Sequence, residues 1–249
     1  MVMHEYGDKS NKAVILLHGL LVPYQIWDDV ADKYSKDYFV VVPELDAHTE
    51  EENTEFISIS DEAKQIYTYV KDKLNGEIYL LAGISMGGRI AATVANMPGI
   101  KIDNLVLDGA PLMKMGSLIK FVMKSNYKSL IKASRKRSPK VKKSFERDFL
   151  PAKYWDLYLK FADRMSAKSI DNCIDTVFMP FEFKKYPENM RILFMHGTKG
   201  NEVVSGRSAA QMKEFNPQTE IKCFDGLPHC HLICFEQDKW MKEVEEFLK

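Results

Sequence analysis

The residue best suited to catalyse a reaction is a serine between glycines, in the run Gly83-Ile84-Ser85-Met86-Gly87. A serine hydroxyl attacks a carbonyl carbon once a neighbouring base takes its proton. Glycines two residues to either side suit a sharp turn from a strand into a helix, where the backbone is crowded. Such a turn lifts the hydroxyl of Ser85 above the sheet. It also leaves the Met86 N–H at a helix start, where it can stabilise an oxyanion.

The residues on both sides of this run supply the strand and the helix that the turn needs. Residues 77–82 are apolar enough for a buried strand, and residues 89–96 continue as an alanine-rich helix. Without this context, the same five residues could form a tight turn in which Ser85 only caps a helix. The context favours a nucleophile.

Short apolar runs alternate with helical patterns over most of the chain, which is typical of a parallel sheet with crossover helices. We expect Pro43 to stop the second strand and Ser60 to be the N-cap of the helix that follows it. Strands are expected at 13–17, 38–42, 77–82, 102–107, 191–195 and 220–224, and helices at 59–74, 89–96 and 239–248.

Between residues 111 and 187 this alternation stops and helical patterns dominate. The predicted fold class is therefore α/β, with a mostly parallel central sheet, flanking helices and a helical cap. Residues 1–111 and 187–249 are expected to form the core. Residues 112–186, the inserted segment, are expected to form the cap that lies over the sheet.

Three motifs in this order resemble the α/β-hydrolase superfamily. Leu16-Leu17-His18-Gly19-Leu20 is similar to the first-strand motif of that family, and residues 81–88 are close to its nucleophile elbow. Residues 42–48 resemble the family's P-D-x-x-G-H-G segment, with Ala47 and Thr49 in place of glycines. The resemblance implies a serine hydrolase whose oxyanion hole is formed by the N–H groups of Leu20 and Met86.

The family order of nucleophile, acid and histidine places the base after the last strand. Gly226-Leu227-Pro228-His229 resembles the family's G-x-G-H, which favours His229 as the base. His231 is the alternative, because it stands five residues before Glu236-Gln237, as in another family motif. His196 follows a strand and is interpreted as a turn residue.

The acid is the least familiar part of the predicted triad. The family usually has an aspartate in H-G-x-x-D, and Gly200 occupies that position here. Glu202 stands two residues later, and its longer side chain could restore contact with the imidazole. Asp175 is the alternative, because some family members carry the acid after an earlier strand. Either carboxylate would orient the imidazole and stabilise its charged form.

Composition describes an ordinary globular protein of 249 residues, with 45% hydrophobic residues and a formal net charge of zero. This balance implies no nucleic-acid partner, and no apolar run is long enough for stable membrane insertion. Four unevenly spaced cysteines do not make a disulfide framework, so a cytoplasmic location is expected. The spacing of cysteines and histidines in 229–234 matches no common zinc site, so no metal is expected. The predicted chemistry needs no cofactor.

Residues 114–143 of the inserted segment carry many lysines and arginines and no acidic residue. A charge run of this kind usually forms a solvated helix face. An alternative is attraction of an anionic substrate or an anionic surface.

The predicted activity is hydrolysis of a carboxylic ester or thioester of a small to medium acyl group, through an acyl-enzyme. The same site could instead cleave C–C bonds or transfer acyl groups. A protein that keeps the fold but only binds ligands is a further alternative, favoured by the absence of an aspartate at position 200.

Overall fold

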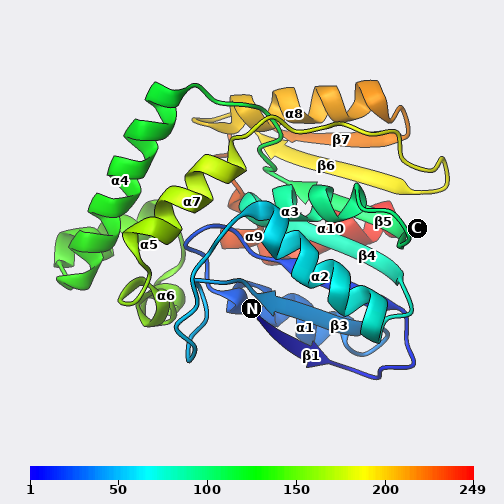
Figure 1. The fold of residues 1–249 in the computed structure, drawn as a ribbon, viewed down its shortest axis with the longest axis horizontal. Helices are drawn as coiled ribbons and strands as arrows, with labels where there is room; N and C mark the ends of the chain where they lie inside the picture. Colours follow the sequence, from blue (N-terminus) through cyan, green and yellow to red (C-terminus); the bar gives the residue numbers. More distant parts are fainter.

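A seven-stranded sheet runs through the computed structural model, which describes residues 1–249 (Figure 1). The strand order is β1-β3-β2-β4-β5-β6-β7, and every neighbouring pair is parallel except β1 and β3. The predicted fold class is therefore confirmed. The strands are β1 (Val2–Tyr6), β2 (Ala13–Leu17), β3 (Phe39–Glu44), β4 (Glu77–Ile84), β5 (Lys101–Asp108), β6 (Arg191–Gly197) and β7 (Thr219–Phe224).

The central strands are continuous apolar runs because helices cover both faces of the sheet. Leu81 on β4 pairs with Ile15 on β2 and with Leu105 on β5, and none of the three is exposed to solvent. Helices α2 and α3 lie in front of the sheet in Figure 1, and α1 and α10 lie behind it. The flanking helices are α1 (Asp28–Tyr34), α2 (Ile59–Lys73), α3 (Met86–Ala95), α8 (Glu202–Phe215) and α10 (Gln237–Leu248), with the short α9 (His231–Phe235) before the last.

Two predictions about β3 and α2 were wrong. Pro43 does not stop β3 but pairs with Met3 of β1. The β2 ladder already ends at Val41, so the missing N–H of Pro43 costs no hydrogen bond on that side. Ser58, not Ser60, caps α2, because the Ser58 hydroxyl accepts a hydrogen bond from the Asp61 N–H at 3.1 Å.

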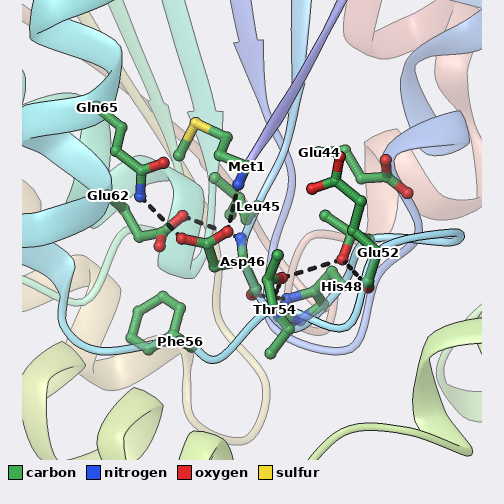
Figure 2. A network of polar contacts seen from close by, with 12 residues as sticks. Met1, Glu44, Leu45, Asp46, His48, Glu52, Thr54, Phe56, Glu62 and Gln65 are labelled. Carbon is green, nitrogen blue, oxygen red and sulfur yellow. Dashed lines mark hydrogen bonds and ion pairs between the residues drawn. The ribbon is translucent and has the colours of Figure 1, made fainter.

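The connection between β3 and α2 is held by polar groups that are partly or fully buried (Figure 2). The Asp46 carboxylate accepts a hydrogen bond from the Gln65 side chain at 2.8 Å, and the Asp46 N–H donates to Glu62 at 3.2 Å. Glu62 is fully buried, and this burial, followed by the charge of Asp46, raises the pKa of Glu62 to about 8. The Thr54 hydroxyl accepts a hydrogen bond from the Ala47 N–H at 2.8 Å.

The inserted segment carries helices alone, and they lie together off one end of the sheet, at the left of Figure 1. Aromatic side chains on α5 and α6 pack against one another, with Phe145 4.9 Å from Tyr158 between ring centroids. No helix of the chain has the length and apolar character needed to cross a bilayer. The helices are α4 (Ser117–Arg135), α5 (Pro139–Asp148), α6 (Trp155–Ala162) and α7 (Ala167–Val177).

Candidate active site

Ser85 lies at the sharp turn between β4 and α3, with φ 51° and ψ −118°. Few non-glycine residues adopt this conformation, and it holds the hydroxyl clear of the backbone. The flanking glycines are required by contact distances. A Cβ on Gly83 would lie 2.4 Å from the Gly87 carbonyl oxygen, and a Cβ on Gly87 would lie 2.3 Å from that of Leu17. Backbone packing therefore fixes the position of Ser85.

The structure brings Ser85, His229 and Glu202 into one chain of hydrogen bonds. His229 Nε2 lies 2.8 Å from Ser85 Oγ, and His229 Nδ1 contacts Glu202 Oε1. Glu202 is buried, and its second oxygen, Oε2, accepts a hydrogen bond from the Gly197 N–H at 2.9 Å. This arrangement is that of a nucleophile, a base and a group that orients the base.

The loops after β6 and β7 hold Glu202 and His229 together. The N–H groups of Thr198 and Lys199 both donate to the Leu227 carbonyl at 3.1 Å. This close approach needs Gly197, because a Cβ there would lie 2.2 Å from the Leu227 oxygen. Glu202 is the first residue of α8, where the helix dipole favours a carboxylate. Glu202 thus reaches the imidazole from the start of a helix. Position 200, where the related motif has an aspartate, holds a glycine here.

The other candidate residues lie away from this chain. His231 pairs with Glu236 at 3.1 Å and stacks on Phe235. Asp175 lies on α7, where it pairs with Lys124 at 2.6 Å and Lys120 at 3.5 Å. These lysines lower the pKa of Asp175. His196 directs its Nδ1 to the Gly197 carbonyl at 2.7 Å, as a turn residue does.

Leu20 and Met86, whose N–H groups are the predicted oxyanion donors, both line the cavity at Ser85. Met86 is the first residue of α3, so no carbonyl stands one turn before it to accept its N–H. The Leu20 N–H has no acceptor in the protein, whereas the next N–H, that of Leu21, donates to His48 Nε2 at 3.0 Å. Backbone N–H groups without a protein acceptor beside a hydroxyl are what an oxyanion hole requires.

Two buried histidines, whose role the sequence analysis did not identify, hold the Leu20 loop. His18 accepts the Leu45 N–H at 3.1 Å, and its other ring nitrogen contacts the Gly19 carbonyl at 2.9 Å. His48 connects Leu21 to the Asp46 carbonyl in the same manner. Burial lowers the pKa of His18 to about 3 and that of His48 to about 4. Both rings therefore stay neutral near pH 7, with one nitrogen donating and the other accepting.

Asp108 is a second buried carboxyl group near the imidazole that the sequence analysis also missed. It ends β5, beside the Ser85 turn, and accepts a hydrogen bond from the Trp240 indole at 3.1 Å. Burial, followed by the charge of Glu202, raises the pKa of Asp108 to about 7. Its position at the end of the strand next to the nucleophile strand was the available signal.

A cavity of about 300 Å³ opens beside Ser85, between the core and the inserted segment. Most of its lining is apolar, and α4, α7, α8 and the residues that flank them contribute most of the apolar side chains. No charged side chain takes part. The lining includes Met115, Ile119, Met123, Tyr127, Ile174, Val177, Phe178 and Val204. No group of three or more His, Cys, Asp or Glu side chains is placed to hold a metal ion. The cavity suits an uncharged, largely apolar group next to the hydroxyl.

Comparison with known proteins matches residues 12–130 to the family described as alpha/beta hydrolase fold. A protein of Gibberella zeae named "AB hydrolase superfamily protein" is 22% identical over 109 residues, which are 43% of this chain and 39% of that protein. The chain thus spans about two fifths of the length of the curated relatives it matches.

Solved structures match over the whole chain at low identity. An alpha/beta hydrolase family protein from Desulfitobacterium hafniense superposes with a TM-score of 0.79 and 17% identity, covering 100% of both chains. A thermophilic esterase from Thermogutta terrifontis superposes with a TM-score of 0.72 and 15% identity, covering 99% of this chain and 92% of the esterase. At this identity the likeness establishes the fold.

Proposed function

We propose that the chain is a member of the α/β-hydrolase superfamily, and that it is a serine hydrolase that cleaves carboxylic esters or thioesters. The observation that carries the proposal is the hydrogen-bonded chain from Ser85 through His229 to Glu202, at the wall of an apolar cavity. If Ser85 only capped α3, neither the imidazole of His229 nor the buried carboxylate of Glu202 would be needed beside it. A ligand-binding protein would not need Ser85 held in a costly backbone conformation.

Acylation begins when Ser85 Oγ attacks the substrate carbonyl carbon and His229 Nε2 takes the hydroxyl proton. Glu202 holds the proton on Nδ1 and stabilises the imidazolium that forms. The tetrahedral oxyanion accepts hydrogen bonds from the Leu20 and Met86 N–H groups. His229 then returns its proton to the leaving alcohol or thiol, and the acyl group stays on Ser85 as an ester.

Deacylation repeats the sequence with water as the nucleophile. His229 takes a proton from water, the hydroxide attacks the acyl carbon, and the second tetrahedral intermediate uses the same two N–H donors. The bond to Ser85 Oγ breaks, Ser85 recovers a proton from His229, and the carboxylic acid leaves. The complete reaction consumes only substrate and water.

The inserted segment acts as the cap that shapes the acyl site. Residues of the segment supply most of the apolar wall, from α4, α7 and the positions next to them. The absence of a charged side chain from the lining supports a neutral acyl group of small to medium size, because a buried unpaired charge in the substrate would be costly there.

The test is hydrolysis of a p-nitrophenyl ester series, acetate to palmitate, by the wild type and by Ser85→Ala. We expect turnover that peaks at one chain length and is absent in Ser85→Ala. Turnover that survives in the variant would exclude Ser85 as the nucleophile. Absence of turnover for every ester and for the matching thioesters would favour C–C bond cleavage, acyl transfer or simple ligand binding.

A further inference from the structure

The first two turns of α4 expose several large apolar side chains to solvent, where a solvated helix face usually carries polar ones. Leu118 is 76% exposed, Phe121 is 69% exposed and Val122 is 48% exposed. Their spacing of three and four residues places them on one face of the helix. Single exposed apolar residues are common, but three together on one face indicate a binding surface.

This apolar face borders the mouth of the Ser85 cavity. Ile119 lines the cavity and is also 53% exposed, so it connects the two. Met123 and Tyr127 follow Ile119 along the same side of α4 at intervals of four residues, and both line the cavity. An apolar ligand held against Leu118 and Phe121 would therefore lie next to the opening that leads to Ser85.

The same face of α4 becomes cationic towards its C-terminus. Lys132 follows Phe121 by eleven residues and Lys136 follows Leu118 by eighteen, which are close to whole numbers of turns. Both lysines are exposed and have no ion-pair partner, whereas Lys124 and Lys128 pair with carboxylates of α7. The lysines of this region without an acidic partner are Lys114, Lys132, Lys136, Lys140 and Lys143.

We propose that this face of α4 docks on an anionic lipid bilayer. The side chains of Leu118, Phe121 and Val122 enter the boundary between headgroups and acyl chains, and Lys132 and Lys136 contact the headgroups. A bilayer is favoured over a protein partner because the cations are spread over long, flexible side chains with no carboxylate among them. Such a set suits a diffuse anionic surface. Docking places the cavity mouth against the lipid, and it does not depend on the proposed hydrolysis.

The test measures co-sedimentation of the full chain with vesicles of phosphatidylcholine alone, or with about a third of phosphatidylserine. Wild type is expected to bind the anionic vesicles at least about tenfold more tightly, and added salt is expected to remove the difference. Leu118→Ser/Phe121→Ser is expected to weaken binding to anionic vesicles by at least about tenfold, from the loss of buried apolar area. Its control is Ile57→Ser, an exposed apolar side chain outside α4.

The charge contribution is tested with Lys132→Glu/Lys136→Glu. Its control is Lys36→Glu/Lys185→Glu, which changes net charge equally but lies just before β3 and β6, at the sheet end opposite the cavity. Lys132→Glu/Lys136→Glu is expected to lose about tenfold or more in affinity for anionic vesicles, and the control less than about threefold. The Tm of all four variants should stay within a few degrees of the wild-type value, which verifies folding without reference to hydrolysis.

Three results would overturn the proposal. They are binding of wild type to neither vesicle, binding of the α4 variants as tight as that of wild type, and equal effects of the two lysine pairs. A concentration-dependent dimer that Leu118→Ser/Phe121→Ser abolishes, without vesicle binding, would assign the face to a second copy of the chain. Vesicle binding by Ser85→Ala separates docking from catalysis, because it should be retained whatever the result of the ester series.

Discussion

The corner where β4, β6 and β7 end and the outer face of α4 are built in different ways. At the corner, the glycines around Ser85 and at position 197 make backbone contacts that leave no room for a Cβ, and the Gly197 N–H donates a hydrogen bond to Glu202. On α4, the outward side chains touch little protein, and Phe121 is mostly exposed. The comparison teaches that geometry is specified tightly where a proton must move over a hydrogen-bond distance. It is specified loosely where only apolar area and charge matter.

The largest effect is expected from Glu202→Gln, which keeps the shape but removes the charge that orients His229. We predict a fall in kcat of about a thousandfold or more for the best ester, with little change in KM. The matched control is Asp108→Asn, the other buried carboxyl group nearby, with a loss below about tenfold. Equal losses, or a larger loss in Asp108→Asn, would transfer the role of acid to Asp108.

His48→Ala tests whether the loop that carries the Leu20 N–H must be held in place by His48 for activity. Without His48, the Leu21 N–H loses its buried acceptor, and the neighbouring Leu20 N–H is no longer held in place. We predict a kcat lower by about ten- to a hundredfold, measured on the same ester. His231→Ala is the control and should retain activity within about twofold, because His231 pairs only with Glu236. The reverse order of effects would favour His231 as the base.

Met123→Ala changes the cavity without touching the hydrogen-bonded chain. Removal of this side chain enlarges the acyl site, so the preferred ester should become longer. Each added methylene that is buried contributes about 0.8 kcal/mol, or about fourfold in kcat/KM. Met179→Ala, which removes a half-exposed methionine that does not line the cavity, should leave the chain-length profile unchanged. An identical shift in both variants would argue against this cavity as the acyl site.

The smallest effect concerns stability, at the buried Glu62 of the β3–α2 connection. The pKa of Glu62 is raised to about 8, so the folded protein keeps a proton that the unfolded chain releases near pH 4.5. Stability from this group is therefore lost as pH rises from about 4.5 to about 8, by at most about 1.4 kcal/mol per pH unit. In Glu62→Gln, Tm should fall less steeply between pH 6 and pH 8. An unchanged slope would show that Glu62 ionises normally.

The parts of the molecule with short-range signals were predictable from sequence. The parallel strands are continuous apolar runs, and the glycines around Ser85 reflect crowding within five residues. His229 and Glu202 came from resemblance to a family, and the structure places them beside Ser85. In the family motif, an aspartate at the position of Gly200 contacts the histidine. In this chain, Glu202 contacts His229 from the start of α8.

The remaining features depend on contacts between distant segments. Strand β1 is half-exposed and mixed in composition, so its pairing with β3 has no apolar signature. Asp175 was nominated from its place in the chain order, but the strand end that faces His229 is Asp108. The roles of His18 and His48 arise from two loops that meet 27 residues apart in the chain, which no local pattern encodes.

The central claim is that Ser85 is a nucleophile activated by His229. Its most direct test is the intact mass of the protein after treatment with a fluorophosphonate, with peptide mapping of the adduct. We predict one adduct per chain on Ser85, formed fast in wild type, slowly in His229→Ala and not at all in Ser85→Ala. Absence of an adduct on folded wild type, or an adduct on another residue, would contradict it.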